Sequence, residues 1–131
     1  MAKSKEEKTN VMRTLEQKKL PYTAHTYDPA GPIDGVSVAQ TLGQLPERVF
    51  KTLVTKGASG AYYVFDIPVA ENLDLKKAAK AVGEKSVAML PQKELLPLTG
   101  YVHGGCSPVG MKKQFPTVFH ETVLLYDCLL Y

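Results

Sequence analysis

Cysteine and histidine are scarce in this chain of 131 residues, which has two cysteines, Cys106 and Cys128, and three histidines. The cysteines form no CxxC pair, and the histidines share no spacing typical of metal ligands. The sequence therefore argues against a zinc site and predicts neither a metal nor another cofactor. This sparing use of cysteine fits the reducing cytosol, so we expect a cytoplasmic protein.

Long apolar runs, repeats and low-complexity tracts are also missing. The first ten residues, "MAKSKEEKTN", have no apolar core of a signal peptide, and no stretch approaches the length of a membrane span, so no membrane partner is expected. No linker divides the chain, which predicts a single domain over residues 1–131, large enough to bury a core. A hydrophobic content of 44% and a charged content of 22% are typical of globular proteins. The net charge of +3 is compatible with a polyanionic partner without requiring one.

What the sequence does contain is a mixture of helix and strand patterns. Residues 49–56 and 61–69 are rich in β-branched and aromatic side chains and flank "GASG", which predicts a hairpin. Residues 73–83 predict a helix that is capped by Asn72 or Asp74 and ends at Gly83. Further helices are predicted for residues 4–19 with Ser4 in a capping box, 38–42 with Ser37 as cap, and 91–98; further strands for 22–27, 85–90, 117–120 and 128–131; and a loop for 28–35.

This interleaving predicts an α/β (α+β) fold: a single compact domain with a mixed, largely antiparallel sheet surrounded by short helices. The last predicted strand, residues 128–131, ends the chain without a cap, a turn or a polar tail. Because folded domains seldom end within a strand, we expect the domain to be truncated at its C-terminus.

Lys51 is the first candidate for a functional residue. Side chains alternate along a strand, so Lys51 shares one face with Val49, Leu53 and Thr55. A lysine is costly to bury there unless it has a partner or a cavity. Two interpretations stay open: the side chain reaches water from an edge strand, or it forms the cationic floor of an anion-binding pocket.

The segment "HGGCSPVG", residues 103–110, combines glycines with reactive side chains. Such a loop either presents successive N–H groups to an anion or a developing oxyanion, or is simply a tight turn. Ser107 does not fit the G-x-S-x-G pattern of a serine nucleophile. Cys106 would need a histidine base, and nothing in the sequence places His103 beside its sulfur. A nucleophilic role for either side chain is therefore the weaker interpretation.

Two further features carry a functional and a structural interpretation. Lys112 and Lys113, in "MKKQ", either contact phosphates or belong to a solvated turn. Tyr27, in "AHTYDP", either stacks on a base or packs in the core.

Four segments together resemble the YbaK-type aminoacyl-tRNA deacylases: "HTY" near the N-terminus, "ERVFKTLV", "LDLKKAAKAVG" and "TGYVHGGCSPVGMKKQFPT". Within that family they are most similar to the bacterial Cys-tRNA(Pro) deacylases, relatives of the editing domain inserted in many prolyl-tRNA synthetases. The similarity runs through nearly the whole chain in the same order and spacing. It implies a mixed-sheet domain whose pocket holds the aminoacylated 3′ end of a tRNA.

The resemblance implies a trans-editing activity, the hydrolysis of the ester that joins a wrong amino acid to tRNA(Pro). Members of the family are thought to use neither a metal nor an enzyme nucleophile. The thiol of a cysteinyl ester is proposed to attack its own carbonyl, while the protein positions the ester and stabilises the oxyanion. The partners implied are tRNA and, transiently, prolyl-tRNA synthetase, with the enzyme itself a monomer.

The same resemblance assigns roles to individual residues. Lys51 matches an essential lysine that holds the terminal phosphate or the ester end of the substrate, with Thr52 beside it. Gly104 matches a backbone contact near the carbonyl, so these three residues are the predicted catalytic set. The remaining predicted contacts are Tyr27, Gly105, Cys106, Ser107 and Pro108 with the substrate, and Lys112 and Lys113 with tRNA phosphates. Among them, Cys106 occupies a position that the motif leaves open.

One departure from the family and two alternatives remain. Family members continue past the strand that matches "CLLY" into a glycine-rich segment, which supplies a pocket carboxylate, and a final helix. If the chain ends where this sequence ends, the resemblance implies an impaired enzyme. The alternatives are a deacylase for Ala-tRNA(Pro) or a broader set of aminoacyl-tRNAs, and a non-catalytic paralogue that binds tRNA or nucleotides.

Overall fold

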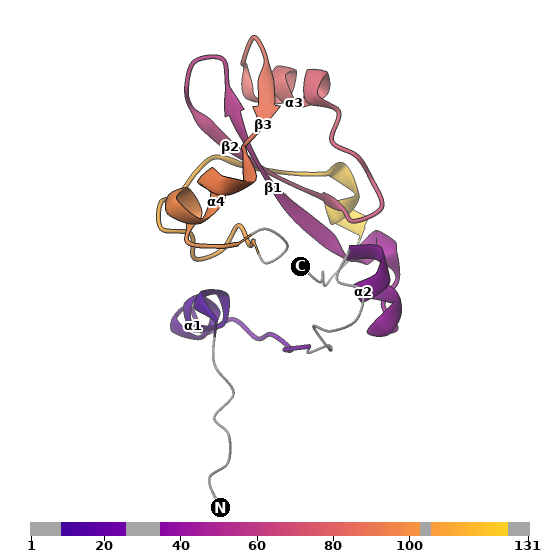
Figure 1. Ribbon diagram of the computed structural model, residues 1–131. Helices are drawn as coiled ribbons and strands as arrows, with labels where there is room; N and C mark the ends of the chain where they lie inside the picture. Colours follow the sequence, from indigo (N-terminus) through magenta and orange to yellow (C-terminus); the bar gives the residue numbers. More distant parts are fainter. Residues whose placement is uncertain (1–8, 26–34, 103–105, 126–131) are drawn as a thin grey trace, which may run out of the picture.

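The computed structural model describes residues 9–25, 35–102 and 106–125, and its centre is a four-stranded sheet (Figure 1). Strands β1 (Phe50–Gly57) and β2 (Tyr62–Pro68) form the predicted antiparallel hairpin. Strand β3 (Val87–Met89) pairs antiparallel with β1, and β4 (Thr117–Phe119) pairs parallel with β2, which gives the order β3-β1-β2-β4. The prediction of a mixed, largely antiparallel sheet is confirmed.

The register of the hairpin decides which side chains share a face. Thr52 lies opposite Asp66 and Val54 opposite Val64, whereas Lys51 lies opposite Ile67. Because side chains alternate along a strand, even-numbered residues of β1 and β2 face one side of the sheet and odd-numbered residues the other. We call these the even face and the odd face.

Helix α4 (Gln92–Thr99) and the chain that follows it cover the even face. Its core consists of Val54, Val64, Leu95 and Phe115, with Cys106 and Met111 among the half-buried side chains packed against it. Phe115 stands edge-to-face with Tyr62, with ring centroids 5.6 Å apart. The segment between α4 and β4 therefore folds back over the sheet.

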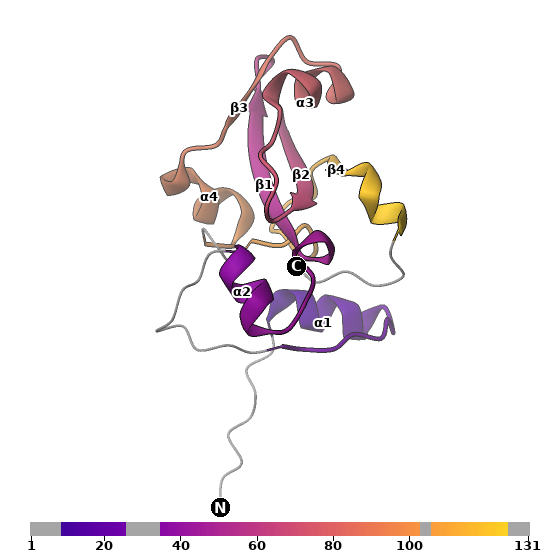
Figure 2. The same ribbon diagram turned by 90° about the vertical axis from the view of Figure 1, so that its right-hand side faces the viewer.

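Two helices cover the odd face. Helix α3 (Leu75–Val82) contributes Ala78 and Ala79 to a core with Phe65 and Val87. Helix α2 (Gly35–Thr41) contributes Ala39 to a smaller cluster with Val49 and Val69 at the far end of the hairpin. Figures 1 and 2 show α4 on one side of the hairpin and α3 on the other.

Helix α3 begins and ends at its predicted capping residues, whereas three other predictions need correction: the starts of α1 and α2, and a strand near the N-terminus. Asp74 accepts hydrogen bonds from the N–H groups of Lys76 and Lys77 and begins α3 as predicted, and Gly83, with φ of 74°, ends it. Helix α1 (Asn10–Gln17) begins after Thr9, whose hydroxyl accepts from Met12 N, and not at Ser4. It ends before Lys19, whose φ of 55° is incompatible with a continuing helix.

The second correction is that Ser37 lies inside α2 and not at its cap, because the helix already begins at Gly35. A Cβ on Gly35 would lie 2.6 Å from Val69 Cγ1, so only glycine allows this approach of α2 to the end of β2. The third concerns the predicted strand over 22–27. The structure assigns no strand to residues 22–25. Tyr22 lies beside α1, where its hydroxyl donates a hydrogen bond to the Glu16 side chain at 2.9 Å.

Two short 3-10 helices were not predicted, η1 (Pro46–Arg48) and η2 (Glu121–Leu125). The predicted helix over 91–98 is α4, shifted by one residue, with Pro91 at its N-cap. The predicted loop over 28–35 lies largely, and the strand over 128–131 wholly, outside the described residues. No helix in the described ranges is long and apolar enough to cross a membrane.

Candidate functional site

A buried carboxyl group is the most unusual feature of the even face. Asp66 is fully buried in the middle of β2, directly across from Thr52 on β1. The Thr52 hydroxyl donates a hydrogen bond to Asp66 Oδ1 at 2.6 Å. Asp66 Oδ2 is also buried and has no hydrogen-bond partner among the described residues. One carboxylate oxygen is thus satisfied by a neighbouring strand and the other is not, which is costly for an ionised group.

Burial has a direct effect on the acidity of this group. It raises the pKa of Asp66 to about 6, with the hydrogen bond from Thr52 acting in the opposite direction. Desolvation disfavours the charged form of Asp66, and no cation within residues 9–25, 35–102 and 106–125 offsets this effect in the way that a salt bridge would. A carboxyl group with a raised pKa inside a sheet is a common mark of a functional position.

Sequence reasoning missed Asp66. The available signal was a single acidic side chain in the middle of the apolar strand "YYVFDIPV", at an even position between Val64 and Pro68. The same argument that singled out Lys51 applied to it, because both charges interrupt an otherwise buried strand.

Cys106 lies over the same face, half-buried against the core formed around Val54 and Val64. Burial raises the pKa of its thiol to about 11, a hydrogen bond with the Thr99 side chain opposes this, and the charge of Asp66 raises it further. The thiol is therefore protonated at neutral pH, whereas a nucleophilic cysteine needs a lowered pKa. This environment argues against Cys106 as a thiolate nucleophile. From the sequence, too, a nucleophilic role for Cys106 is the weaker interpretation.

The rest of the loop is held by hydrogen bonds. Ser107 is buried, and its Oγ accepts from Val109 N at 3.1 Å. Tyr101 donates its hydroxyl to Val109 O at 2.6 Å. Gly110 has φ of 78°, and a Cβ there would lie 3.0 Å from the Tyr101 hydroxyl and 3.2 Å from Thr14 Oγ1 of α1. Ser107 thus shapes the loop through its own backbone, and Gly110 lets α1 approach it closely.

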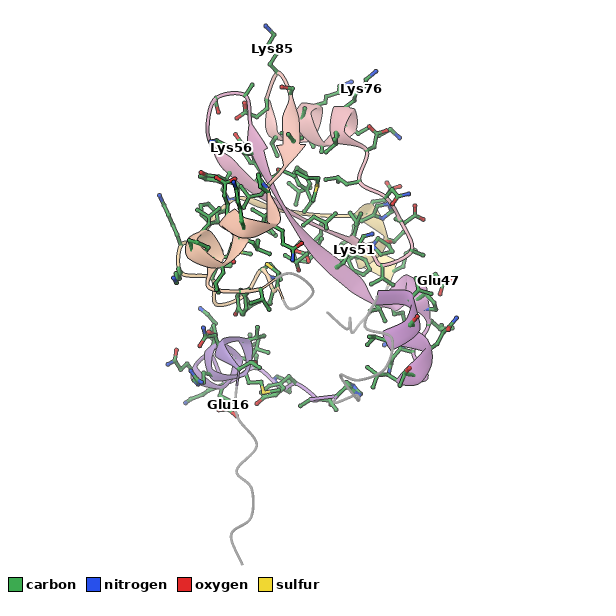
Figure 3. The ribbon with its side chains drawn as sticks, viewed as in Figure 1. Glu16, Glu47, Lys51, Lys56, Lys76 and Lys85 are labelled. Carbon is green, nitrogen blue, oxygen red and sulfur yellow. The ribbon has the colours of Figure 1, made fainter. Side chains whose placement is uncertain are left out.

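Lys51 lies on the odd face, although Thr52 is its neighbour in the same strand. Figure 3 shows Lys51 on the side of β1 that faces η2 and α2, away from α4. The side chain of Lys51 is half-buried. This burial is compatible with both predicted interpretations, a lysine that reaches water and a lysine in an anion-binding pocket. The structure therefore places Lys51 and Thr52 at one end of β1 but directs their side chains to opposite faces.

The other predicted site residues fall into two groups. Tyr27, Gly104 and Gly105 lie outside the described residues, so their predicted roles stay predictions. Lys112 and Lys113 are exposed; Lys112 N donates to Thr99 O at 3.0 Å, and its aliphatic stem covers Gly100. Pro108 is half-buried. Across residues 9–25, 35–102 and 106–125, no group of three or more histidine, cysteine, aspartate or glutamate side chains could hold a metal ion.

The fold and the sequence place this protein in a known family. Residues 34–130 match the family of aminoacyl-tRNA editing domains, and the chain belongs to that family. The family acts on aminoacyl-tRNA, so the predicted resemblance and the predicted enzyme class are confirmed at this level.

Individual relatives make the comparison more specific. The chain is 48% identical, over 99% of its length, to EbsC of Enterococcus faecalis, a protein named as a candidate Cys-tRNA(Pro)/Cys-tRNA(Cys) deacylase, and it covers 80% of that protein. Among solved structures, a candidate trans-editing enzyme for prolyl-tRNA synthetase is 30% identical with a TM-score of 0.78, covering 89% of this chain and 73% of that one.

A second solved structure, of a protein described only as hypothetical, is 22% identical with a TM-score of 0.81, over 91% of this chain and 78% of that one. At that identity it supports the fold alone. The chain of this protein therefore shares both the family's architecture and, with EbsC, nearly half of its sequence.

Proposed function

We propose that this protein is a trans-editing deacylase that hydrolyses the ester of Cys-tRNA(Pro). The support is its membership of the aminoacyl-tRNA editing family and its 48% identity to a protein named for that substrate. We further propose that it works in the cytoplasm as a monomer and docks transiently on prolyl-tRNA synthetase.

The observation that carries the mechanism is the half-buried position of Cys106 against the core of the even face, where burial raises the pKa of its thiol. With a pKa of about 11, this thiol supplies no attacking thiolate at neutral pH. Ser107 is buried and tied to its own loop. These environments disfavour an enzyme nucleophile, and in the proposed reaction the thiol of the cysteinyl ester attacks instead, as the family resemblance implies.

The proposed step balances without a co-reactant. The substrate thiol attacks the ester carbonyl, a C–S bond forms, the C–O bond to the ribose breaks, and the thiol proton passes to the leaving ribose oxygen. Water then opens the cyclic thioester to free cysteine. Lys51 would hold the terminal phosphate or ester end, and the Gly104 N–H would stabilise the oxyanion.

A deacylation assay with the full chain tests both parts. We expect Cys-tRNA(Pro) to be hydrolysed faster than Ala-tRNA(Pro), and Pro-tRNA(Pro) to be spared. Ser-tRNA(Pro), in which a hydroxyl replaces the thiol, should also be spared because a hydroxyl is the weaker nucleophile. Hydrolysis of the serine ester at the cysteine rate would contradict the substrate-assisted step, and no turnover of any ester would contradict the deacylase.

A further inference from the structure

Three lysines surround a groove between α3 and β3, on the side of the sheet that α3 covers and opposite to the even face that holds Asp66. The groove has a volume of about 420 Å³, and Lys76, Lys80 and Lys85 line it together with Glu84. Its floor is apolar, with Leu75, Ala79 and Val87. Figure 3 shows Lys76 and Lys85 projecting outward at the same end of the molecule.

Two of these lysines lie on α3: Lys80 in the last turn, where a cation favours the helix dipole, and Lys76 in the first turn, where it does not. Lys76 and Lys80 are four residues apart and so lie on one face of α3, where like charges repel. Lys76 is also in the first turn, at the positive pole of the helix, and that turn contains no acidic residue. The acidic N-cap, Asp74, favours the dipole at this end, whereas Lys76 opposes it.

The one acidic side chain of the groove is turned toward another partner. The Glu84 carboxylate accepts hydrogen bonds from the Ser59 N–H at 3.2 Å, from the Ser59 hydroxyl and from the Tyr63 hydroxyl at 2.6 Å. These bonds lower the pKa of Glu84, so it stays ionised while bound to the hairpin turn. Three lysines thus outweigh one glutamate whose carboxylate is already hydrogen-bonded to Ser59 and Tyr63.

We propose that the groove between α3 and β3 binds the phosphate backbone of RNA, as a second contact of the aminoacyl-tRNA outside the site that holds the ester. The inference rests on the proposed function for the identity of the RNA. The chemistry fits because lysines at intervals along a groove neutralise successive phosphates without reading sequence.

Binding of uncharged tRNA(Pro), followed by fluorescence anisotropy across a range of salt concentrations, tests this proposal. We expect the variant Lys76→Ala/Lys80→Ala/Lys85→Ala to bind at least about tenfold more weakly, and its slope of log affinity against log salt to fall by about two to three. The matched control, Lys18→Ala/Lys93→Ala/Lys56→Ala, removes the same charge from exposed positions elsewhere and should keep most of the affinity.

The thermal midpoint separates binding from folding. Because Lys76 opposes the helix dipole, Lys80 favours it and Lys85 lies outside the helix, their joint removal should leave the midpoint nearly unchanged. Equal tRNA affinity of the two triple variants would overturn the proposal, as would a groove variant that keeps tRNA binding but loses binding to prolyl-tRNA synthetase. If the wild type binds tRNA through the groove yet hydrolyses no ester, the groove stands and the proposed deacylase fails.

A second inference comes independently from the buried pair on the even face. A threonine hydroxyl has one proton, and in Thr52 that proton is donated to Asp66 Oδ1. Thr52 is half-buried while Asp66 lies fully behind it, so only the lone pairs of the Thr52 oxygen are available to a ligand. We infer that Asp66 is a positioning residue that makes Thr52 an acceptor for the α-ammonium group of the aminoacyl ester. This inference also rests on the proposed function.

The pH dependence of kcat/KM distinguishes a positioning role of Asp66 from a purely structural one, because a purely structural role would not change the pH profile. Below about pH 6, a protonated Asp66 no longer forces Thr52 to donate, so activity should fall as the pH decreases. Cys106 faces Asp66 from the loop but stays protonated throughout this range. His120 contacts Asp66 only through a backbone bond from its N–H to Asp66 O at 2.9 Å.

We expect Asp66→Asn to lower kcat/KM at neutral pH and to lose the acid limb, Thr52→Val to lower activity similarly, and Thr52→Ser to restore it. An acid limb that persists in Asp66→Asn, or a fully active Thr52→Val, would overturn the inference. A wild type without deacylase activity would instead contradict the proposed function, and tRNA binding measured as above would still test the groove.

Discussion

The two faces of the central sheet are built from adjacent residues of the same two strands, yet their chemistry differs. The even face buries a carboxyl group, Asp66, beside a protonated thiol, Cys106, under the loop that follows α4. The odd face is covered by alanines of α2 and α3, and the one charged residue that β1 and β2 place there, Lys51, is half-buried. The carboxyl group is enclosed on one face, whereas the lysine on the other is not.

This difference shows that burial decides the protonation state of the ionisable groups on each face and their access to ligands. Enclosure raises the pKa of both Asp66 and Cys106, so the even face favours neutral groups and fixed hydrogen bonds. A half-buried lysine keeps access to anionic ligands. The proposed reaction uses one residue from each face at the start of β1. Lys51 on the odd face would supply the cation, and Thr52 on the even face would supply the hydrogen-bond acceptor.

The largest expected effect separates Lys51 from Cys106. Lys51→Ala should lower deacylation of Cys-tRNA(Pro) by about 100-fold or more, because it removes the charge that holds the anionic end of the substrate. Cys106→Ala should retain activity within a few-fold, because its thiol is protonated and does not attack. Single-turnover deacylation rates measure both. An inactive Cys106→Ala beside an active Lys51→Ala would require a different nucleophile.

The next effect concerns stability and follows from Asp66. Its pKa is raised in the folded state from 3.8 to about 6, so the fold binds this proton more tightly than the unfolded chain does. Stability from this group is therefore present below about pH 4 and is lost as the pH rises through about 6. The shift corresponds to about 3 kcal/mol of unfolding free energy.

Urea denaturation of the wild type and of Asp66→Asn across this pH range measures the contribution as a difference between the two proteins. All other groups are the same in the two proteins, so their contributions cancel in the difference. A difference that stays flat between about pH 4 and pH 7 would show that Asp66 is not desolvated in solution.

The smallest effect tests how tightly the loop is held on the even face. Gly110→Ala should cost about 2 kcal/mol, because its positive φ disfavours alanine and the new Cβ would press on Tyr101 and α1. Gly60→Ala is the matched control: its φ is also positive, 91°, but nothing lies within 4 Å of a Cβ there. It should cost about 1 kcal/mol. Equal losses in chemical denaturation would mean that α1 does not pack on the loop.

Elements with strong local signals were predicted well from the sequence. The hairpin of β1 and β2 followed from two β-branched segments around "GASG", and α3 followed from Asp74 and Gly83 at its ends. The failures came where distant contacts override local preference. Residues 22–25 carry strand-forming side chains, but no strand edge is paired with them, and Ser37 is a good cap placed inside a helix.

The candidate site was predicted only in part. Lys51, Thr52 and the loop around Cys106 were singled out by their residue types and by the family resemblance, whereas Asp66 was not. Its significance depends on the register that sets it opposite Thr52, and register is a property of two strands together.

The sequence by itself determined the order of the elements, the family and the residues with reactive groups, because these depend on local pattern and composition. Only the tertiary structure decided that Thr52 donates to a buried Asp66 and that Cys106 is half-buried beside the same core, which raises the pKa of its thiol. Those properties come from strand pairing and from exclusion of water, and both exist only once segments distant in the chain have packed together.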